Sequence, residues 1–507
     1  MKEVNFDYDL LVVGGGINGV GIARDAAGRG LRVLLCEKDD LAAHTSSAST
    51  KLIHGGLRYL EYYEFGLVRK ALKEREVLLR AAPHIISPLR FVMPHRPHLR
   101  PAWMIRAGLF LYDHLSRREL LPGSRSVNLA QHALGQPLQE DIRRGFVYSD
   151  AWVDDARLVV LNAMDARERG ARILTRTRLM SAQREGALWQ ALLHSEERGE
   201  LRVSARAVVN AAGPWASELL HQHLHLAARN DVRLVKGSHI VVRKMFDHDH
   251  AYIFQNPDKR IIFAIPYQQA LTLIGTTDLE YRDDPDKVRI SADETAYLCE
   301  SVNRYFRQNI TPADVLWSYS GVRPLLEQEH TGNPSAVTRD YHLELNGDAH
   351  QAPVLSVFGG KITTYRCLAE EALDRLAEPL AIEKKAWTAH AALPGGDIPD
   401  ADFQRFSQRF QRDYPWLPQP LAERYARSYG TRAGMLLAGC SSLADLGTEL
   451  SFCLYAAEVR YLVRHEWARS SEDILWRRSK LGLYATPESA QRLDDYLRSL
   501  LNDASLS

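Results

Sequence analysis

The chain has 507 residues, 45% hydrophobic and 25% charged, which is the composition of a globular protein with room for about two to four domains. A formal net charge of +1 provides no general attraction to nucleic acid, so we expect no nucleic-acid partner. The five cysteines are scattered and form no CxxC pair, which favours neither a zinc site nor a disulfide framework. We therefore expect no metal and a reducing, cytoplasmic setting.

No cleavable signal and no membrane span are expected. The N-terminal stretch MKEVNFDYDLLVVGGG carries acidic residues among its first ten positions, and its apolar run ends in glycines. The longest uncharged runs, 10–23 and 261–277, are interrupted by Gly, Pro and Gln, whereas a span needs about 20 mostly apolar residues. The sequence predicts a protein that does not cross a bilayer but can lie on one.

The N-terminal segment has the pattern of a dinucleotide-binding fold. The apolar run DLLVV predicts a buried strand, and GGGING follows it ahead of an Ala-rich helix and a second strand that ends at Glu37. Gly14 permits a tight turn, Gly16 lets a pyrophosphate approach the helix N-terminus, and Gly19 lets helix and strand pack closely. Glu37 can accept hydrogen bonds from ribose hydroxyls and disfavours a 2′-phosphate. NADP is thus unfavourable, FAD and NAD remain, and a purely structural glycine turn is the alternative interpretation.

Two later segments favour FAD over NAD. ARAVVNAAGPWA (205–216) predicts a strand and a tight turn that returns beside the glycine loop. VLSVFGGKITTYRCLAEEAL (354–373) predicts a strand, a double-glycine turn and a helix whose N-terminus, with Lys361, suits the charge on a reduced flavin. An ordinary turn with a solvated lysine is the alternative for this segment alone. Three distant glycine turns indicate one extended cofactor, which we predict to be non-covalently bound FAD.

Longer motifs occur in order along the whole chain: GGGINGVGIARDAAGRG, SSASTKLIHGGLRYLE, RGFVYSDAWVDDARLV, KGSHIVV, IGTTD, SGVRPL, FGGKITTYR and YLVRHEWARSSEDILWRR. Together they resemble the FAD-dependent respiratory (aerobic) glycerol-3-phosphate dehydrogenases. GxGxxG and NAAGPW are shared by many flavoproteins, whereas HGGLRYLE, KGSH, GVRPL and GGKITTYR are far more specific. The resemblance implies oxidation of sn-glycerol 3-phosphate to dihydroxyacetone phosphate by hydride transfer from C2 to N5 of FAD. It also implies that the electrons pass to a membrane quinone.

The same resemblance implies an α/β fold in which two domains are interleaved ahead of a helical C-terminal domain. The runs HIVVRKMF, IIFAIPY and LTLIGTTD predict strands of a mostly antiparallel sheet in the substrate domain. ALPGGDIPD predicts a linker, after which apolar residues recur at helical spacing. The expected domains are a Rossmann-like FAD-binding domain of the amino-acid-oxidase type (1–90, 150–220 and 340–385), a substrate and membrane-contact domain (91–149 and 221–339), and a C-terminal helical cap (386–507).

The double-glycine loop STKLIHGGLRYLE (49–61) is expected to cross the flavin, with its first residues on the cofactor side and its glycines close to the ring. The motifs and the resemblance together imply the following cofactor-binding residues: Gly14, Gly16, Ile17, Asn18, Gly19, Glu37, Lys38, Ser46, Ser49, Thr50, Lys51, Ile53, His54, Gly55, Gly56, Ala212, Gly213, Trp215, Gly360, Lys361, Ile362 and Thr363.

A glycerol phosphate needs cations around its phosphate, and the planar fork of arginine binds phosphate oxygens in pairs. Arg58, Arg323 and Arg339 follow glycines or lie in short turns, where a side chain can reach a cavity. The resemblance places these arginines at the substrate, adds the hydroxyl of Tyr59, and suggests a hydrogen bond from Thr276. A surface ion pair is the alternative for any single arginine.

Oxidation of the carbinol also needs a proton acceptor that titrates near neutrality, which favours histidine. We predict His239, which follows a glycine at the start of a strand, and His54 beside two glycines is the competitor. A structural histidine is the alternative interpretation of His239. With Arg323 near the phosphate and Lys361 beside the flavin ring, these are the expected catalytic residues.

The segment RPHLRPAWMIRAGLFLYDHLSRRELL (96–121) combines apolar and aromatic residues with flanking arginines and is too short to span a bilayer. It fits a helix lying among lipid headgroups, and a core helix with a solvated basic rim is the alternative. The resemblance implies a peripheral protein on the cytoplasmic face of the inner membrane, in contact with phospholipid and quinone, and a homodimer.

Three other functions are compatible with parts of these patterns. An oxidase of the same substrate would pass electrons to O₂, and an amine or hydroxy-acid oxidase of the same flavin clan would bind a carboxylate with its arginines. A flavin-binding scaffold without catalysis belongs to a different class. The co-occurrence of Arg58, Arg323, His239 and Lys361 disfavours the scaffold, which needs none of them.

Overall fold

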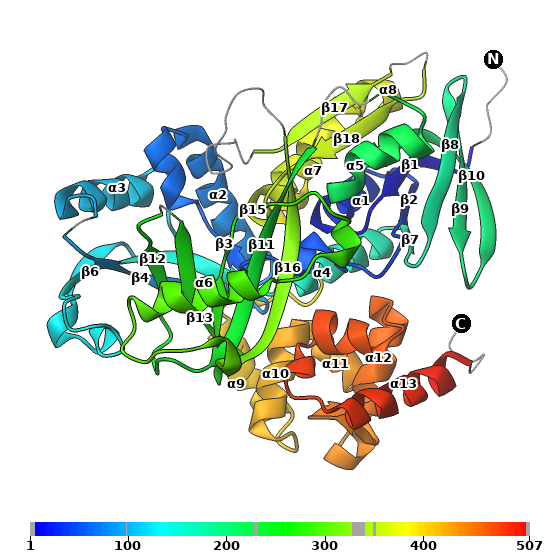
Figure 1. The fold of residues 1–507 in the computed structure, drawn as a ribbon. Helices are drawn as coiled ribbons and strands as arrows, with labels where there is room; N and C mark the ends of the chain where they lie inside the picture. Colours follow the sequence, from blue (N-terminus) through cyan, green and yellow to red (C-terminus); the bar gives the residue numbers. More distant parts are fainter. Residues whose placement is uncertain are drawn as a thin grey trace.

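Two large β-sheets and a helical C-terminal unit make up the fold (Figure 1). The computed structural model describes residues 6–97, 99–227, 232–258, 260–326, 340–347 and 351–502. None of the helices within these ranges is both long enough and apolar enough to cross a bilayer.

The first sheet contains eight strands in the order β17-β18-β10-β1-β2-β7, extended by β8 and β9. The five central strands are parallel, and β1 runs between β10 and β2. Their apolar runs are buried on both faces, as expected for parallel strands covered by helices. The strands are β1 (Tyr8–Val13), β2 (Val33–Cys36), β7 (Arg172–Leu174), β8 (Arg178–Glu185), β9 (Leu188–Ser195), β10 (Gly199–Asn210), β17 (His342–Asn346) and β18 (Val354–Phe358).

Helix α1 follows β1 directly and packs between α4 and α7 against this sheet. Its small residues make this possible: a Cβ on Gly21 would lie only 2.8 Å from the ring of Tyr365 in α7. The helices of this part are α1 (Ile17–Gly28), α2 (Phe65–Ala81), α4 (Asp155–Glu168), α5 (Ala216–Glu218), α7 (Tyr365–Arg375) and α8 (Ala377–Leu380).

The second sheet contains ten strands in the order β15-β11-β14-β13-β12-β4-β6-β3, with β16 paired to β11 and β5 paired to β6. Its neighbouring strands are antiparallel except for β4 and β12, which run parallel. Helix α6 (Ala292–Asn303) covers one face and α3 (Ala102–His114) projects at the edge of the molecule (Figure 1). The strands are β3 (Leu52–Ile53), β4 (Ile86–His95), β5 (Arg125–Asn128), β6 (Arg144–Val153), β11 (Val232–Arg243), β12 (Ala251–Gln255), β13 (Ile261–Tyr267), β14 (Leu271–Gly275), β15 (Leu279–Glu280) and β16 (Val315–Leu326).

The two sheets alternate along the chain, which is why distant segments meet between them. The first sheet takes its strands from the ranges proposed for the FAD-binding domain, and most of the second takes them from 91–149 and 221–339. Strand β3 and the start of β4 lie within 1–90 yet belong to the second sheet. The division that we propose therefore groups β3 with the segments of the first sheet and cuts through β4.

The C-terminal unit has a hydrophobic core of its own. Phe410 is buried in that core, and the phenylalanines one and two turns earlier in the same helix pack against it. Buried ion pairs, such as Arg478 with Asp40 and Arg157 with Glu466, join this unit to the rest of the molecule. Its elements are α9 (Phe403–Asp413), α10 (Gln419–Tyr429), α11 (Ala433–Leu436), β19 (Glu449–Ser451), β20 (Leu454–Tyr455), α12 (Ala456–Glu466) and α13 (Pro487–Asn502).

Candidate active site

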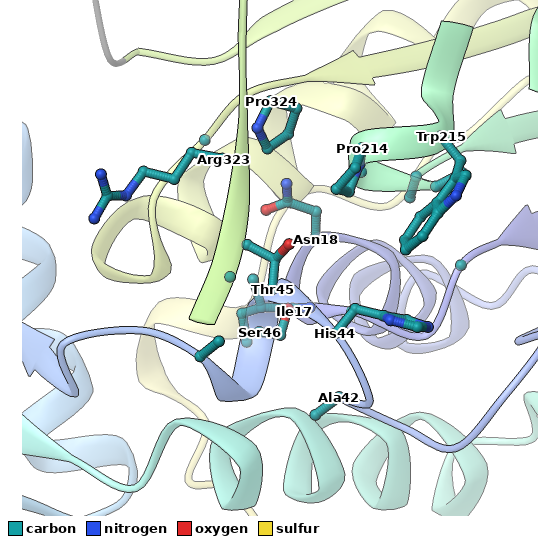
Figure 2. A pocket seen from close by; sticks show the side chains of 18 of the residues that line it. Ile17, Asn18, Ala42, His44, Thr45, Ser46, Pro214, Trp215, Arg323 and Pro324 are labelled. Atoms are coloured by element: carbon teal, nitrogen blue, oxygen red, sulfur yellow. Dashed lines mark hydrogen bonds between the residues drawn. The ribbon is translucent and has the colours of Figure 1, made fainter. Parts of the chain in front are cut away.

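A cavity of about 680 Å³ opens at the carboxyl ends of the parallel strands. Its wall contains residues at or just beyond the ends of β1, β2, β7, β10 and β18, and β16 of the second sheet closes it from the other side (Figure 2). Ligands of open parallel sheets bind at this edge because the loops that connect strands to helices converge there. The cavity reaches from Trp215 and His44 at one end to Arg323 at the other (Figure 2).

The glycine loop after β1 forms one wall of the cavity. Gly14 has a φ of +116°, and a Cβ there would lie 2.5 Å from the carbonyl oxygen of Ala211. A Cβ on Gly19 would lie 1.9 Å from the carbonyl oxygen of Gly14, so helix and strand pack closely here. Gly16 precedes α1, and a Cβ on it would approach Ser46 to 3.0 Å. The geometry leaves room for a pyrophosphate against bare backbone at the helix N-terminus.

Glu37 lies at the end of β2 with its carboxylate fixed by backbone amides. Oε2 accepts a hydrogen bond of 2.6 Å from Gly15 N, and Oε1 accepts one of 2.8 Å from Asp39 N. Burial raises the pKa of Glu37, and these amides oppose the rise. Lys38 also lines the cavity, with its Nζ 4.0 Å from the ring centroid of Trp215. This end can therefore hold a ribose and an adenine.

Glu37, Asp39 and His44 each place one potential metal-ligand atom within 4.8 Å of the others. These atoms already have partners: Asp39 and His44 share a hydrogen bond of 2.8 Å, and Glu37 accepts from two amides. The donor set is therefore explained without a metal ion.

Most of the predicted cofactor-binding residues line the large cavity, namely Gly14, Gly16, Ile17, Asn18, Glu37, Lys38, Ser46, Ser49, Thr50, His54, Ala212, Gly213, Trp215, Gly360, Lys361 and Ile362. Those that do not line it support the loops instead. Thr363 Oγ1 accepts a hydrogen bond of 3.2 Å from His54 N, and Gly55 N donates to the hydroxyl of Tyr112. Gly19, Lys51, Ile53 and Gly56 also lie outside this wall.

Lys51 anchors the loop before β3 from inside the protein. It is 0% exposed, and its Nζ donates hydrogen bonds of 2.8 and 2.9 Å to Asp155 and one of 3.0 Å to Ser47 O. The hydroxyl of Ser49 also donates to Asp155, over 2.8 Å. A buried ion pair at the start of α4 thus fixes the backbone that presents Ser49 and Thr50 to the cavity.

A second cavity of about 110 Å³ adjoins the first, and His54, Tyr59, Thr276 and Arg323 line both. Its wall also holds two more arginines and two aspartates, Arg58, Arg260, Asp150 and Asp278. Lys361 lies on the shared side, with its Nζ 3.8 Å from the ring centroid of Tyr59. A small polar molecule in the second cavity would therefore meet the occupant of the first.

Arg323 extends from β16 between the two cavities. Its Nη1 donates a hydrogen bond of 3.1 Å to Asp278, and its Nη2 donates one of 3.2 Å to Thr276 Oγ1. Gly237 in the paired strand β11 lies opposite Gly321, two residues before Arg323, and a Cβ there would approach Nη2 to 2.6 Å. The glycine of the KGSH motif therefore makes space for the guanidinium.

The two candidate histidines lie at different depths. His239 is 1% exposed and lies outside the walls of both cavities, with its Nε2 3.0 Å from Thr50 Oγ1 and its ring stacked on Tyr319. Burial, Arg323 and Lys51 hold the pKa of His239 well below its usual 6.5. His54 lines both cavities. Thr50 therefore lies between His239 and the cavity, and its hydroxyl links the histidine to the cavity wall.

One predicted residue, Arg339, lies outside the described residues. Several wall residues were not predicted, notably His44, Thr177 and Arg260. Thr177 comes just after β7, so its position beyond a parallel strand was a usable signal. Arg260 precedes β13 in a segment without a glycine or a motif, and no local pattern marks it.

Comparisons with known proteins agree with this geometry. Residues 9–366 match the FAD dependent oxidoreductase family, and residues 386–502 match the C-terminal domain of alpha-glycerophosphate oxidase. A glycerol-3-phosphate dehydrogenase of Pseudomonas aeruginosa is 58% identical over 97% of this chain and 95% of its own. The aerobic glycerol-3-phosphate dehydrogenase of Escherichia coli is 50% identical over 96% of this chain and 97% of its own.

Two further comparisons bear on substrate and cofactor. A D-erythritol 1-phosphate dehydrogenase of Brucella abortus is 53% identical over 94% of this chain and 95% of its own. The crystal structure of a Bacillus halodurans glycerol-3-phosphate dehydrogenase complexed with FAD superposes with a TM-score of 0.75, at 26% identity, over 99% of this chain and 95% of that one. The predicted fold class and the predicted FAD cofactor are confirmed. The chain belongs to the FAD-dependent glycerol-3-phosphate dehydrogenase family.

Proposed function

We propose that this enzyme oxidises sn-glycerol 3-phosphate to dihydroxyacetone phosphate and passes the electrons to a membrane quinone. The observation that carries the proposal is the contact between the two cavities: one is built for a dinucleotide, and the other gathers Arg58, Arg260 and Arg323 beside it. Three guanidiniums in a cavity of about 110 Å³ suit a small phosphate monoester. The relatives from Pseudomonas and Escherichia are named as glycerol-3-phosphate dehydrogenases.

The arginines are proposed to hold the phosphate and thereby orient the carbinol. Arg323 is already fixed by Asp278 and Thr276, so little side-chain entropy is lost when a phosphate binds. Tyr59 and Thr276 belong to both walls and can hydrogen-bond the hydroxyls between them. Arg339, which lies outside the described residues, stays a predicted phosphate ligand.

When bound, FAD would supply the acceptor of the hydride from the carbinol carbon, and with it of two electrons. Lys361 is proposed to lie beside the flavin ring, because it lines the large cavity next to two glycines with positive φ. An ammonium there stabilises the negative charge of the reduced ring. The ring of Tyr59, under the same ammonium, helps to keep it at the junction of the cavities.

The proton of the C2 hydroxyl is proposed to reach His239 through Thr50. Thr50 lines the cavity and lies within hydrogen-bond distance of His239. The lowered pKa of His239 keeps its ring neutral but makes it a weaker proton acceptor than a group that titrates near neutrality. His54 is the alternative acceptor because it lines both cavities directly. If His239→Asn retained wild-type single-turnover flavin reduction from about pH 6 to pH 9 while His54→Asn lost it, the role would belong to His54.

The electron acceptor and the membrane contact are proposed from α3 and its surroundings. Trp103 is 71% exposed and Phe110 is 57% exposed, and the two lie on the same face of the helix, two turns apart. Tyr63, on the neighbouring segment, is 80% exposed. Arg100 and Arg117 flank this face and can contact lipid phosphates. Such a surface suits a peripheral protein that lies on phospholipid and draws quinone from it. The cytoplasmic face of the inner membrane and a homodimer are further parts of the proposal.

Anaerobic mixing of the purified flavoprotein with sn-glycerol 3-phosphate tests the reaction. Loss of the oxidised-flavin absorbance, followed by reoxidation with a soluble quinone, is the expected result. D-erythritol 1-phosphate serves as the comparison, given the Brucella relative, and faster bleaching by it would transfer the proposal to the longer substrate. Reoxidation by O₂ with stoichiometric peroxide, and none by quinone, would identify an oxidase instead.

A further inference from the structure

A third cavity, of about 170 Å³, lies between the first sheet and the C-terminal unit, apart from the two cavities of the active site. Its wall is unusually basic, because five arginines face a single acidic residue. They come from four separate segments: the end of α4, the loop after β7, the turn between β9 and β10, and α12 with the loop after it. The wall consists of Arg167, Ile173, Thr175, Arg176, Glu197, Arg198, Val463, Arg464, Trp467 and Arg469.

Two of these arginines have a structural role that accounts for their presence. Nη2 of Arg167 donates a hydrogen bond of 2.9 Å to His465 O, and its guanidinium lies 4.4 Å from the ring centroid of Trp467. Nη1 of Arg469 donates to Val463 O and Ala468 O over 3.3 and 3.1 Å. Free carbonyls at a helix C-terminus attract cations, so these two arginines cap α12.

The positive charge of the other three arginines is not fully explained by contacts that stabilise the fold. Nη2 of Arg176 donates a hydrogen bond of 2.7 Å to Asp473, but its Nη1 is buried and makes no hydrogen bond within the described part of the chain. Arg198 and Arg464 are exposed at the rim and form no ion pair with any described residue. A buried donor without a partner is costly, and a ligand that accepts its hydrogen bond would remove that cost.

Counter-charge within the protein does not balance this cluster. Asp473 already accepts from Arg176, from Arg477 and from the amides of Arg469 and Ser470. Glu197 reaches Arg469 only at 4.0 Å. Burial lowers the pKa of the Arg469 guanidinium, and the charges of Arg176 and Arg198 add to that effect. The guanidiniums repel one another, so an anion between them would be bound favourably.

We propose that this arginine pocket is a second anion site, which binds the phosphate group of a soluble ligand. Planar guanidiniums match tetrahedral oxyanions, and Arg176, which lines this polar cavity, has a buried donor without a partner. A bound phosphate would connect β7 and the β9–β10 turn to α12, and so join the C-terminal unit to the first sheet. Binding to the native state alone would raise the stability of the whole enzyme.

A lipid headgroup carries the same phosphate chemistry, but the position of the pocket favours a ligand from solution. Helix α3, with its exposed Trp103 and Phe110, lies at one edge of the molecule, whereas α12 belongs to the C-terminal unit, which lies below the two sheets and away from α3 (Figure 1). A membrane that contacts α3 would therefore leave the pocket facing water.

Titration of the FAD-loaded enzyme with inorganic phosphate and pyrophosphate, at constant ionic strength, tests the proposal by calorimetry and thermal unfolding. We expect saturable binding and a higher Tm in the wild type. The double substitution R198Q/R464Q removes two rim charges that pair with no acidic group in the described ranges, and should weaken this binding at least about tenfold while the fold is retained. Arg176→Gln should weaken it likewise. The matched control R202Q/R492Q, on exposed arginines outside the pocket, should leave it unchanged.

Three outcomes would overturn the assignment. No binding at millimolar pyrophosphate would exclude the site. Equal affinity in R198Q/R464Q and wild type, with loss in Arg323→Gln, would place all of the binding in the active site. Sedimentation with phosphatidylglycerol vesicles separates the two phosphate sources. If R198Q/R464Q reduced vesicle binding while R202Q/R492Q did not, the pocket would belong to lipid headgroups rather than to a soluble ligand.

Discussion

Arg323 shows how one side chain can serve two neighbouring cavities. Arg323 lies on β16 and is held by hydrogen bonds to Asp278 and Thr276. Its guanidinium lies close to Gly237 in the paired strand β11. Its usefulness depends on that glycine as much as on its own charge. The motifs SGVRPL and KGSH therefore act together: the second supplies the space that the arginine of the first occupies, although they lie far apart in the sequence.

Gly237→Ala is expected to displace Arg323, because the new Cβ would lie 2.6 Å from Nη2 and 2.7 Å from Thr276 Oγ1. We expect kcat/KM for sn-glycerol 3-phosphate to fall about 10- to 100-fold, or roughly 1.4 to 2.7 kcal/mol of transition-state stabilisation. Steady-state kinetics with a soluble quinone, together with the flavin spectrum, measures this. Gly66→Ala is the control, since its Cβ meets no atom within 4 Å. Wild-type kinetics in Gly237→Ala would show that Arg323 does not hold the substrate.

Lys361→Met is expected to lower the two-electron midpoint potential of the flavin, because a cation beside the ring stabilises its reduced form. A loss of about 1.4 kcal/mol of stabilisation corresponds to roughly 30 mV. Spectroelectrochemical titration of both proteins measures the shift. Lys38→Met is the matched control, since Lys38 lies at the Trp215 end of the same cavity and should leave the potential unaltered. A potential identical to that of the wild type in Lys361→Met would remove Lys361 from the flavin ring.

Helix α3 is an element whose role is not explained by internal packing. Only Leu109, Tyr112 and Asp113 of its residues are buried, and the most exposed of its large apolar side chains are aromatic. An apolar helix normally gains its stability by burying an apolar face against the core. Here part of the apolar surface points outward, so the structure supports the interfacial interpretation of 96–121 over that of a core helix.

The double substitution W103A/F110A is expected to weaken binding to anionic phospholipid vesicles at least about 100-fold, because each aromatic side chain contributes on the order of 1.5–3 kcal/mol when buried in apolar surroundings, or roughly 3–6 kcal/mol together. Vesicle sedimentation measures the partition coefficient. Reduction of the flavin by substrate in solution should be unchanged. L316A/M435A is the control, because those residues are also exposed but lie on other elements. Equal loss in both double variants would mean that α3 has no special part in membrane contact.

At the scale of the whole molecule, the C-terminal unit is joined to the rest through buried polar groups. His84, between α2 and β4, is 1% exposed, and neither ring nitrogen has a hydrogen-bond partner among the described residues. Gly395 and Gly430 of the C-terminal part approach it so closely that Cβ atoms there would lie 3.2 and 3.0 Å from its ring. Burial, together with the charge of Arg157, lowers the pKa of His84 to about 3.

This pKa predicts a loss of stability in acid. Above pH 6.5 His84 is neutral in both states, and between pH 6.5 and about 3 the unfolded chain takes up a proton that the folded protein does not. The free energy of unfolding should therefore fall by up to about 1.4 kcal/mol per pH unit on this account. Urea unfolding at several pH values should show a shallower dependence in His84→Gln than in the wild type or in His221→Gln, an exposed control. Parallel curves for His84→Gln and wild type would contradict the prediction.

Local patterns were sufficient for the parts of the site that are built from consecutive residues. The run from β1 through the glycine loop to Glu37 was predictable because strand, turn and helix have their own signatures, and the structure has them in that order. The parallel strand ahead of Ala-Ala-Gly-Pro was predictable for the same reason. Lys51 stays a predicted residue of the cofactor side, but the ion pair of its buried ammonium with Asp155, a residue far along the chain, could not be predicted. Charge in a sequence does not reveal which partner compensates it.

By itself the sequence determined the family, the FAD cofactor, the two kinds of sheet and the helical C-terminal unit, because glycine turns, hydrophobic periodicity and long motifs are local properties of the chain. Only the tertiary structure decided which residues from distant parts of the sequence come into contact. It placed Gly237 against Arg323, put Thr50 between His239 and the cavity, and gathered five arginines from four segments into one pocket. These contacts depend on the packing of segments that lie far apart in the sequence, and no local pattern encodes that packing.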